Sequence, residues 1–418
     1  MRKFQSRTER RKPIAIVRRF PFAAFCLLLT AYCSLIPANA QTKLTPHKIA
    51  LKSGKSFSLD LPADYEIIPA AEGLKRVRFF AKAPDGRIFV TDMYNLTDNT
   101  RGKVYILDDF DKRTGKFGRV TEYMSGLKNP NSIAFYRDGS GQDWFYLAET
   151  DKLTRRRFKR GETSPTDKKP ETLVTFPDYG LSYKYGGWHL TRTVVIGDNG
   201  KLYISVGSSC NSCVEKKTEE SRATIMEMNP DGSDQKIFAR GLRNAVGLRW
   251  MGRYLWATNQ GSDHLGNSKP DETFYAVREG TDYGWPYCYQ ANGGVFSDPK
   301  LRRRSGCRDV PESYAYFPAH SSALGFDYFD SETSDPLIKD SFLVALHGST
   351  NKNIGHGYKI VIMRKGEKLE DFLTGFLRRG TVLGRPCDIF KLTPDSFLLS
   401  DDHIGVVYLI RRKAKINS

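Results

Sequence analysis

The residue of this sequence best suited to acid–base chemistry is His189, which stands where an apolar segment begins. It follows Gly186, Gly187 and Trp188, and Leu190 comes next. Glycines let a backbone approach a ligand closely, and an imidazole titrates near neutral pH. A histidine at a strand entrance can therefore serve as a general base. Spacing alone favours the alternative, a histidine with a structural role.

Two further segments offer groups that bind anions. Arg243 and Asn244 follow a glycine-leucine pair, and Gln260 ends the next apolar run, before Gly261 and Ser262. A guanidinium and two amides suit the carboxylates and carbonyls of a planar polyanion. The alternative is a surface arginine that pairs with an acid.

A third segment could hold a hard cation. Acids and tight turns alternate in Pro270–Glu272 and Gly280–Pro286, where Tyr283 lies. Carboxylates and backbone carbonyls around tight turns are the ligands that calcium takes in proteins. The spacing is not that of an EF-hand, and the segment alone is equally compatible with ordinary loops.

These candidates lie within six repeats of one pattern. Each repeat has an apolar strand, a turn with Asp-Gly or its equivalent, a second apolar strand that ends in a small or polar residue, and a third strand. The pattern is typical of antiparallel hairpins. Repeats that start about 50 to 80 residues apart fit four-stranded blades with inserted loops. We therefore predict an all-β fold, a six-bladed β-propeller of four-stranded antiparallel blades over residues 70 to 412. A β-sandwich is the alternative, but it does not account for six similar units. The repeats start near Val77, Asn131, His189, Leu242, Ser322 and Gly384.

Radially packed blades would place equivalent positions of each repeat around one central funnel. The positions before the first strand and at the end of the second strand are mostly polar, whereas a core would be apolar. A funnel of arginines, histidines and amides would be an anion-binding pocket that contains a base. The first set of positions is Arg76, Asn131, His189 with Arg192, Arg243 with Asn244, His320 with Ser321, and Arg385; the second set is Asp92, Glu149, Ser208, Gln260, His347, and Asp401 with Asp402.

The first forty residues predict an export signal. A basic stretch from Arg2 to Arg19 precedes an apolar run from Phe20 to about Pro37, and Ala38-Asn39-Ala40 fits a small-residue cleavage site. The apolar run is too short and too poorly flanked for a lasting membrane span. We expect residues 1–40 to be a signal peptide and residues 41–418 to form a single propeller domain, periplasmic or secreted, with no membrane span.

The charge of the chain argues against nucleic-acid binding. Eight basic residues and one glutamate lie in residues 1–40, so the formal charge falls from +18 to +11 after cleavage. The remaining basic residues are scattered rather than arrayed with stacking aromatics.

The cysteines that remain after cleavage predict disulfides within loops. Export permits disulfides. Cys210 and Cys213 share one short loop, and Cys288 and Cys307 bracket another. We predict one disulfide in each loop and a free Cys387.

Taken together, these motifs resemble the glucose/sorbosone dehydrogenase family, and most closely its sorbosone-dehydrogenase-like branch. The resemblance covers nearly all of residues 45 to 412. It is carried by GGWHLTRT at 186–193, LYISVGSSCNSC at 202–213, RATIMEMNPDGS at 222–233, FARGLRNAVGLRW at 238–250, LWATNQGSD at 255–263, PDETFYAVREGTDYGWPYCY at 270–289, PAHSSALGF at 318–326 and FLVALHGS at 342–349.

The resemblance implies a six-bladed propeller that binds pyrroloquinoline quinone and calcium. It implies that the histidine after the glycines removes the proton of a sugar's anomeric hydroxyl while hydride passes to the quinone, a role that falls on His189. The cofactor would be held by Arg243, Asn244 and Gln260, joined in the funnel by Arg192, His347 and Arg385. Calcium that bridges to the cofactor would be bound by backbone carbonyls of Gly261 and Ser262, and a second, structural calcium by Glu272 and Tyr283.

Departures from the family pattern fall in the cofactor set. His347 stands where glucose dehydrogenases have a lysine, and Arg385 is kept from a pair of arginines, with Cys387 in the other place. Trp188 replaces an acidic neighbour of the base.

The expected function is that of a quinoprotein sugar dehydrogenase. Its substrate would be an aldose-type sugar or related alcohol, and its electrons would pass to a cytochrome or quinone of the respiratory chain. One alternative is a propeller that has lost the cofactor and binds a glycan or a protein. The other is a lactonase-like hydrolase, with Asp92, Glu149 and Asp401 supplying part of a metal cage.

Overall fold

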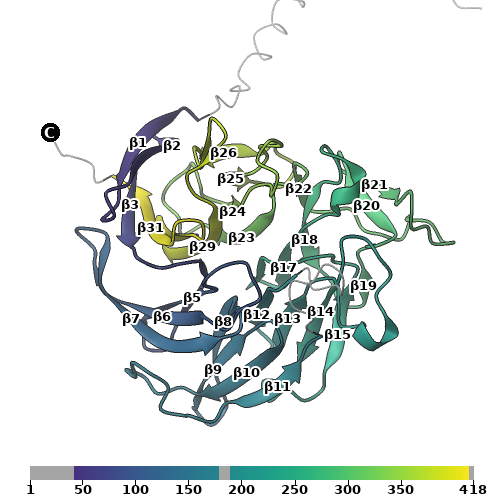
Figure 1. The fold of residues 1–418 in the computed structure, drawn as a ribbon, viewed down its shortest axis with the longest axis horizontal. Coiled ribbons are helices and arrows are strands. Elements are labelled where there is room, and N and C mark those ends of the chain that lie inside the picture. Colours follow the sequence, from purple (N-terminus) through teal and green to yellow (C-terminus); the bar gives the residue numbers. More distant parts are fainter. Residues whose placement is uncertain (1–41, 178–188, 414–418) are drawn as a thin grey trace, which may run out of the picture. The chain divides into compact units, whose positions relative to one another are not determined.

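The computed structural model describes residues 42–177 and 189–413, which form a six-bladed β-propeller whose blades are antiparallel four-stranded sheets, one of them extended by a short fifth strand (Figure 1). The predicted fold is confirmed. Among the described residues the helical segments are two short 3-10 turns, η1 (Lys217–Glu219) and η2 (Asp263–Leu265). No helix in these ranges is long and apolar enough to cross a membrane. The predicted signal peptide and Trp188 with the two glycines before it lie outside the described residues.

Each blade is one sheet, and in blades 1 to 5 the strands follow the chain order from the first strand outward. Blade 1 comprises β4 (Val77–Lys82), β5 (Ile88–Asp92), β6 (Gly102–Asp111) and β7 (Lys116–Leu127), and blade 2 comprises β8 (Ser132–Arg137), β9 (Asp143–Ala148), β10 (Lys152–Arg157) and β11 (Glu171–Thr175). Blade 3 comprises β12 (Arg192–Ile196), β13 (Leu202–Val206), β14 (Thr224–Met228) and β15 (Lys236–Arg240), with the short β19 (Thr281–Asp282) added in parallel.

The second half of the ring follows the same plan. Blade 4 comprises β16 (Leu248–Met251), β17 (Tyr254–Asn259), β18 (Glu272–Val277) and β22 (Ala315–Phe317), and blade 5 comprises β23 (Ala323–Phe329), β24 (Ser341–Leu346), β25 (Lys359–Met363) and β26 (Glu370–Leu373). Blade 6 comprises β29 (Pro386–Thr393), β30 (Ser396–Asp401), β31 (Val406–Arg412) and β3 (Tyr65–Ala71). Three hairpins or pairs lie outside the blades: β1 (Leu44–Ala50) with β2 (Ser56–Pro62), β20 (Cys288–Ala291) with β21 (Gly294–Ser297), and β27 (Leu377–Arg378) with β28 (Thr381–Val382).

The ring is closed by the N-terminal strand β3. It pairs antiparallel with β31, from Tyr65 opposite Arg412 to Ala71 opposite Val407, so the last blade joins both ends of the propeller. The purple β3 lies beside the yellow β31 in Figure 1. The repeat pattern did not predict this strand, because a single strand without its hairpin partner carries no repeat signature.

The first strands of the six blades contact one another in a closed circle, β4, β8, β12, β16, β23 and β29. The predicted repeats begin at these strands or a few residues before them. Buried apolar side chains from four blades meet on this circle, Phe79, Val246, Leu324 and Cys387. Cys387 is free, as predicted, and the disulfides Cys210–Cys213 and Cys288–Cys307 are both present.

Candidate active site

The acids that end the second strands cap the backbone of their own blades. Asp92 accepts the N–H groups of Lys75 and Arg76 at 2.7 and 2.9 Å, and Asp401 accepts that of Arg385 at 2.8 Å. Glu149 and Asn259 accept backbone N–H groups in blades 2 and 4 in the same manner. These side chains therefore hold the loops that enter blades 1, 2, 4 and 6. Residues just after the second strand supply a site side chain in four blades, namely Ser208, Gln260, His347 and Asp402.

The tautomer of His189 follows from its contact with Ser208. The imidazole Nδ1 lies 2.9 Å from the Ser208 carbonyl oxygen and 3.2 Å from its hydroxyl. A carbonyl only accepts, so Nδ1 carries the hydrogen and Nε2 carries the lone pair. Burial and the charge of Arg243 lower the pKa of His189 well below its usual value. The ring is thus neutral near pH 7, with Nε2 able to take a proton.

A glycine fixes the distance between His189 and the neighbouring amide. A Cβ placed on Gly207 would lie 2.5 Å from His189 Cβ and 2.5 Å from Asn244 Oδ1. Asn244 Nδ2 donates in turn to Gln260 Oε1 at 2.9 Å. The base and two of the predicted cofactor residues therefore pack around one small residue.

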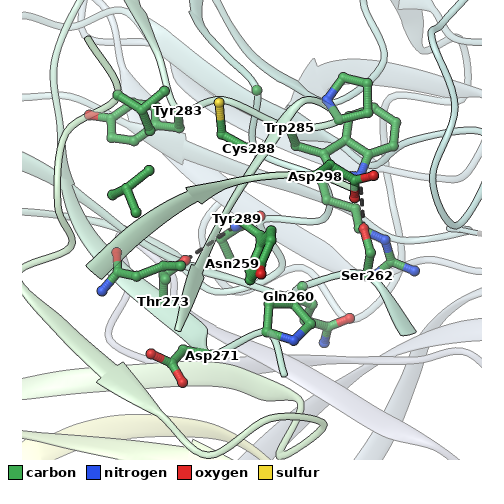
Figure 2. Close-up of a pocket in the computed structure, with 18 of the residues that line it drawn as sticks. Asn259, Gln260, Ser262, Asp271, Thr273, Tyr283, Trp285, Cys288, Tyr289 and Asp298 are labelled. Atoms are coloured by element: carbon green, nitrogen blue, oxygen red, sulfur yellow. Dashed lines mark hydrogen bonds between the residues drawn. The ribbon is translucent and has the colours of Figure 1, made fainter. Parts of the chain in front are cut away.

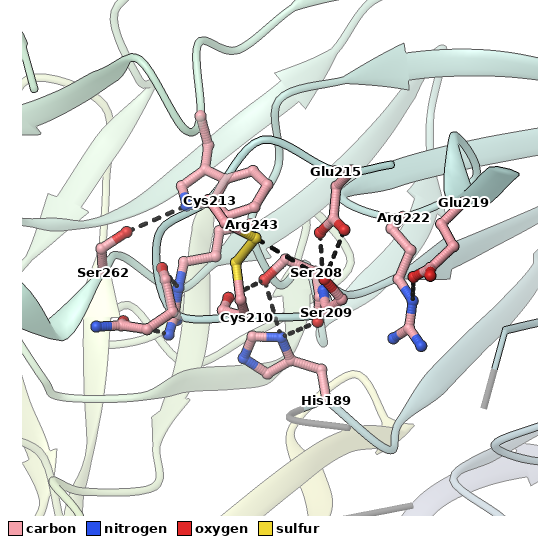
Figure 3. The surroundings of a disulfide bond; sticks show 12 residues. His189, Ser208, Ser209, Cys210, Cys213, Glu215, Glu219, Arg222, Arg243 and Ser262 are labelled. Atoms are coloured by element: carbon pink, nitrogen blue, oxygen red, sulfur yellow. Dashed lines mark hydrogen bonds and ion pairs between the residues drawn. A yellow bond between two sulfur atoms is a disulfide. The ribbon is translucent and has the colours of Figure 1, made fainter. Parts of the chain in front are cut away.

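The guanidinium of Arg243 is buried beside the base and held by two residues. Its Nε and Nη2 donate to Asn211, and Nη2 lies 3.5 Å from Asp263 Oδ2. Figure 3 shows Arg243 and His189 on the same side of the Cys210–Cys213 turn. The structure thus brings a guanidinium, a neutral imidazole and two amides together.

A small cavity beside Arg243 is lined in part by the loop that follows β17 (Figure 2). Arg243, Gln260, Gly261, Ser262 and Tyr283 all line it. A Cβ on Gly261 would lie 2.3 Å from Pro270 Cγ, so this loop requires glycine where it crosses the next segment. The remaining lining includes Asn259, Asp271, Thr273, Trp285, Tyr289, Gln290 and Asp298.

Glu272 is buried in a different environment from Tyr283. Burial raises the pKa of Glu272 to about 8, with the charge of Asp263 raising it further and those of Arg243 and His320 opposing. Its Oε2 has no hydrogen-bond partner among the described residues. Tyr283 packs on Tyr275 instead, and its hydroxyl bonds the backbone of Arg278 and Ala276. Asp271, one residue before Glu272, lines the cavity with Tyr283.

A second polar cluster joins blades 5, 6 and 1. Asp402 Oδ1 lies 2.8 Å from His347 Nε2, and Oδ2 lies 2.6 Å from Arg78 and 3.1 Å from Arg76. Burial alone would raise the pKa of Asp402, but His347 and the two guanidinium groups hold it far below its usual value. Arg385 donates to the Gly348 and Ser349 carbonyls and lies 3.4 Å from His347 Nδ1.

Arg192 holds the backbone of His189 in place. It is almost fully buried, and its Nη1 donates to the backbone oxygens of His189 and Thr191 at 2.7 and 2.9 Å. Of the predicted set, Arg243, Asn244, Gln260 and Arg192 lie around His189, while His347 and Arg385 belong to the Asp402 cluster.

Sequence reasoning missed three contributors, Asn211, Asp263 and Arg78. Arg78 interrupts an apolar strand, Val77-Arg78-Phe79-Phe80, and a charge in such a run is a usable signal. Asn211 and Asp263 lie in loops without a pattern, and nothing in the sequence distinguishes them from other loop residues.

Part of this chain matches a known protein family. The model of the glucose/sorbosone dehydrogenase family matches residues 142–354. An uncharacterised protein of Borreliella burgdorferi is 28% identical over 225 residues, which are 51% of this chain and 57% of that protein. The chain thus spans little more than half the length of this curated relative.

Solved structures share the fold at low sequence identity. The pyrroloquinoline quinone domain of pyranose dehydrogenase from Coprinopsis cinerea has a TM-score of 0.66 and 19% identity, covering 85% of this chain and 97% of that one. The soluble aldose sugar dehydrogenase of Escherichia coli has a TM-score of 0.57 and 13% identity, covering 84% and 100%. At these identities the likeness supports the propeller fold alone.

Proposed function

Because this chain belongs to the glucose/sorbosone dehydrogenase family, we propose that it is a quinoprotein oxidoreductase that oxidises an aldose-type sugar or a related alcohol. The observation that carries the proposal is the state of His189. Its Nδ1 is committed to the Ser208 carbonyl, which leaves a neutral Nε2 as a proton acceptor beside a buried guanidinium.

His189 would act on the hydroxyl of the bound sugar. A base is most effective when its neutral form is populated at the working pH, and the lowered pKa of His189 ensures this. Arg192 and Ser208 keep the ring from rotating, because one holds its backbone and the other its Nδ1–H. The imidazolium formed after proton removal would be disfavoured by Arg243, so the proton would leave again readily.

The hydrogen-bond donors of the funnel suit an anionic quinone. Arg243 offers a buried positive charge whose Nη1 makes no hydrogen bond to the described residues, and Gln260 and Asn244 add amide groups at its side. Pyrroloquinoline quinone carries carboxylates and carbonyls, for which these are suitable partners. When bound, it supplies the two-electron acceptor for the sugar's hydride. His347 and Arg385 would border it from the opposite blades.

The residues predicted to bind calcium differ in how well their side chains suit a cation. Gly261 and Ser262 line the cavity next to Gln260, where their carbonyls would serve a bridging cation. The unpartnered Oε2 of Glu272 is a ligand atom that a cation would satisfy, and a bound cation would also keep this carboxylate ionised. Asp271 and Tyr283 share the cavity with Gly261, so Asp271 is a further candidate ligand there.

The lactonase alternative is weakened by the contacts of Asp92. Both of its carboxylate oxygens accept backbone N–H groups, whereas Glu149 and Asp401 each use one oxygen in this way. A metal cage built from all three would therefore have to break the cap at the entrance of blade 1. The cofactor-free binding propeller remains the second outcome of the test below. We further propose that the mature chain works outside the cytoplasm and passes electrons to a respiratory acceptor.

The test is reconstitution of the purified mature protein with pyrroloquinoline quinone and calcium. Dye reduction would be followed on a panel of aldoses, for wild type and His189→Ala. We expect calcium-dependent turnover that is lost in the variant, with an acidic limb in kcat/KM below pH 6.5. Absence of both quinone binding and turnover would refute the dehydrogenase and favour the binding propeller.

A further inference from the structure

The turn after Ser208 is tied down on both sides of its disulfide. Ser208 Oγ donates to the Cys210 carbonyl at 2.7 Å, and Ser209 donates through its N–H and hydroxyl to Glu215 at 2.7 and 2.6 Å. Cys210 and Cys213 are joined across two intervening residues. The turn is therefore a small closed ring with fixed ends, next to the base (Figure 3).

Asn211 lies inside this ring and contacts Arg243 twice. Arg243 Nε donates to the Asn211 backbone oxygen at 2.9 Å, and Nη2 donates to Asn211 Oδ1 at 2.9 Å. The same Oδ1 accepts the backbone N–H of Asp263 at 2.8 Å. One asparagine thus links the turn, the arginine and the loop that follows Gln260.

Two hydrogen-bond acceptors on one residue fix the orientation of a guanidinium plane as well as its position. Nε and Nη2 point to the same side of the group, so binding both leaves Nη1 as the edge available to a ligand. The Arg243 side chain is 5% exposed, and in such surroundings these charge-assisted bonds are strong. An arginine oriented in advance loses less conformational entropy when a ligand binds.

We propose that Asn211 is the positioning residue for Arg243, and that the Cys210–Cys213 disulfide keeps Asn211 in place. The inference rests on the proposed function only for what Arg243 binds. Without the cross-link, a loop that carries Asn211 samples many conformations, and the arginine loses its fixed orientation.

The first experiment needs no ligand. Arginine side-chain NMR would follow rotation of the Arg243 guanidinium in the mature protein, with its signals assigned through Arg243→Lys. We expect slow rotation in wild type and in Asn211→Asp, which keeps the Oδ acceptor, and fast rotation in Asn211→Ala and in Cys210→Ser/Cys213→Ser. The matched control is Asn199→Ala, which removes an asparagine from the β12–β13 turn of the same blade. Among the described residues its side chain bonds Tyr203 and Lys201. Unchanged rotation in Asn211→Ala overturns the proposal, whether or not the protein binds a quinone.

The second experiment asks whether Asn211 acts through Arg243. Calorimetric titration of the calcium-loaded protein with pyrroloquinoline quinone should show a dissociation constant raised about 10- to 100-fold in Asn211→Ala and restored in Asn211→Asp. In the Arg243→Ala background, Asn211→Ala should add nothing further, because coupled residues are not additive. A full additional loss in that background would overturn the inference. Failure of wild type to bind would refute the proposed cofactor and leave the NMR result to decide on Asn211.

Discussion

Gly207→Ala is the substitution whose effect on the site can be worked out most directly. The added Cβ would lie 2.5 Å from His189 Cβ and 2.5 Å from Asn244 Oδ1. Two carbon atoms rest about 3.5–4.0 Å apart, so His189 or the loop that carries it must move by about 1 Å. A displacement of this size at a catalytic group lowers the rate by about 100-fold. The overpacking should cost about 1–3 kcal/mol of folding free energy.

The assay separates these two effects. The kcat and KM of the reconstituted enzyme would be measured at a temperature where urea unfolding shows the variant to be fully folded. Gly139→Ala is the matched control, since nothing lies within 4 Å of its Cβ and its φ is not positive. If Gly207→Ala kept its kcat within about threefold of wild type while folded, the packing of His189 against this glycine would not matter for the reaction, and the reasoning would fail.

Three further predictions concern stability. Burial raises the pKa of Asp388 to about 7. Its contribution to the free energy of unfolding is therefore fully present below about pH 4 and is lost as pH rises through 7, a fall of at most about 4 kcal/mol. The urea midpoint of unfolding should fall less steeply from pH 5 to 8 in Asp388→Asn than in wild type. Cys288→Ser/Cys307→Ser opens a loop of sequence separation 19 and should cost about 3 kcal/mol by calorimetry, and a loss below 1 kcal/mol would contradict the loop argument. Asp402→Asn leaves Arg78 buried without its counter-charge and should lower the free energy of unfolding by about 3–5 kcal/mol. An unchanged midpoint of urea unfolding would contradict this prediction.

Periodic features of this chain were predictable, and the unique ones were not. Six similar hairpin units predict six sheets, because alternation and turn residues are local properties of the sequence. Strand β3 was not predicted, because its partner β31 is over 330 residues away along the chain and the two strands pair only when the ring closes. The two disulfides were predictable because each closes a short loop.

The candidate site shows the same division. The funnel residues His189, Arg243 and Gln260 occupy repeated positions, so their convergence follows from the repeat. Glu272 and Tyr283 were assigned to one cation by resemblance, yet the Tyr283 side chain packs on Tyr275 and bonds the backbone, whereas Glu272 Oε2 has no hydrogen-bond partner among the described residues. Asn211 is recognisable only once the disulfide and the arginine are seen together, because its role depends on a contact between blades 3 and 4.

His189 and His347 lie in the two polar clusters of the predicted funnel, and their partners decide which could act as a base. Burial lowers the pKa of both, and Arg243 beside His189 and Arg385 beside His347 lower it further. His347 uses Nε2–H for Asp402, and its Nδ1 faces an N–H of Arg385 at 3.4 Å. A proton arriving at that nitrogen would meet a guanidinium that already donates to it. His189 has its Nδ1 committed to a carbonyl and presents Nε2 with no such donor among the described residues. We therefore propose His189 rather than His347 for proton removal, with His347 as a hydrogen-bonding side chain whose orientation Asp402 fixes.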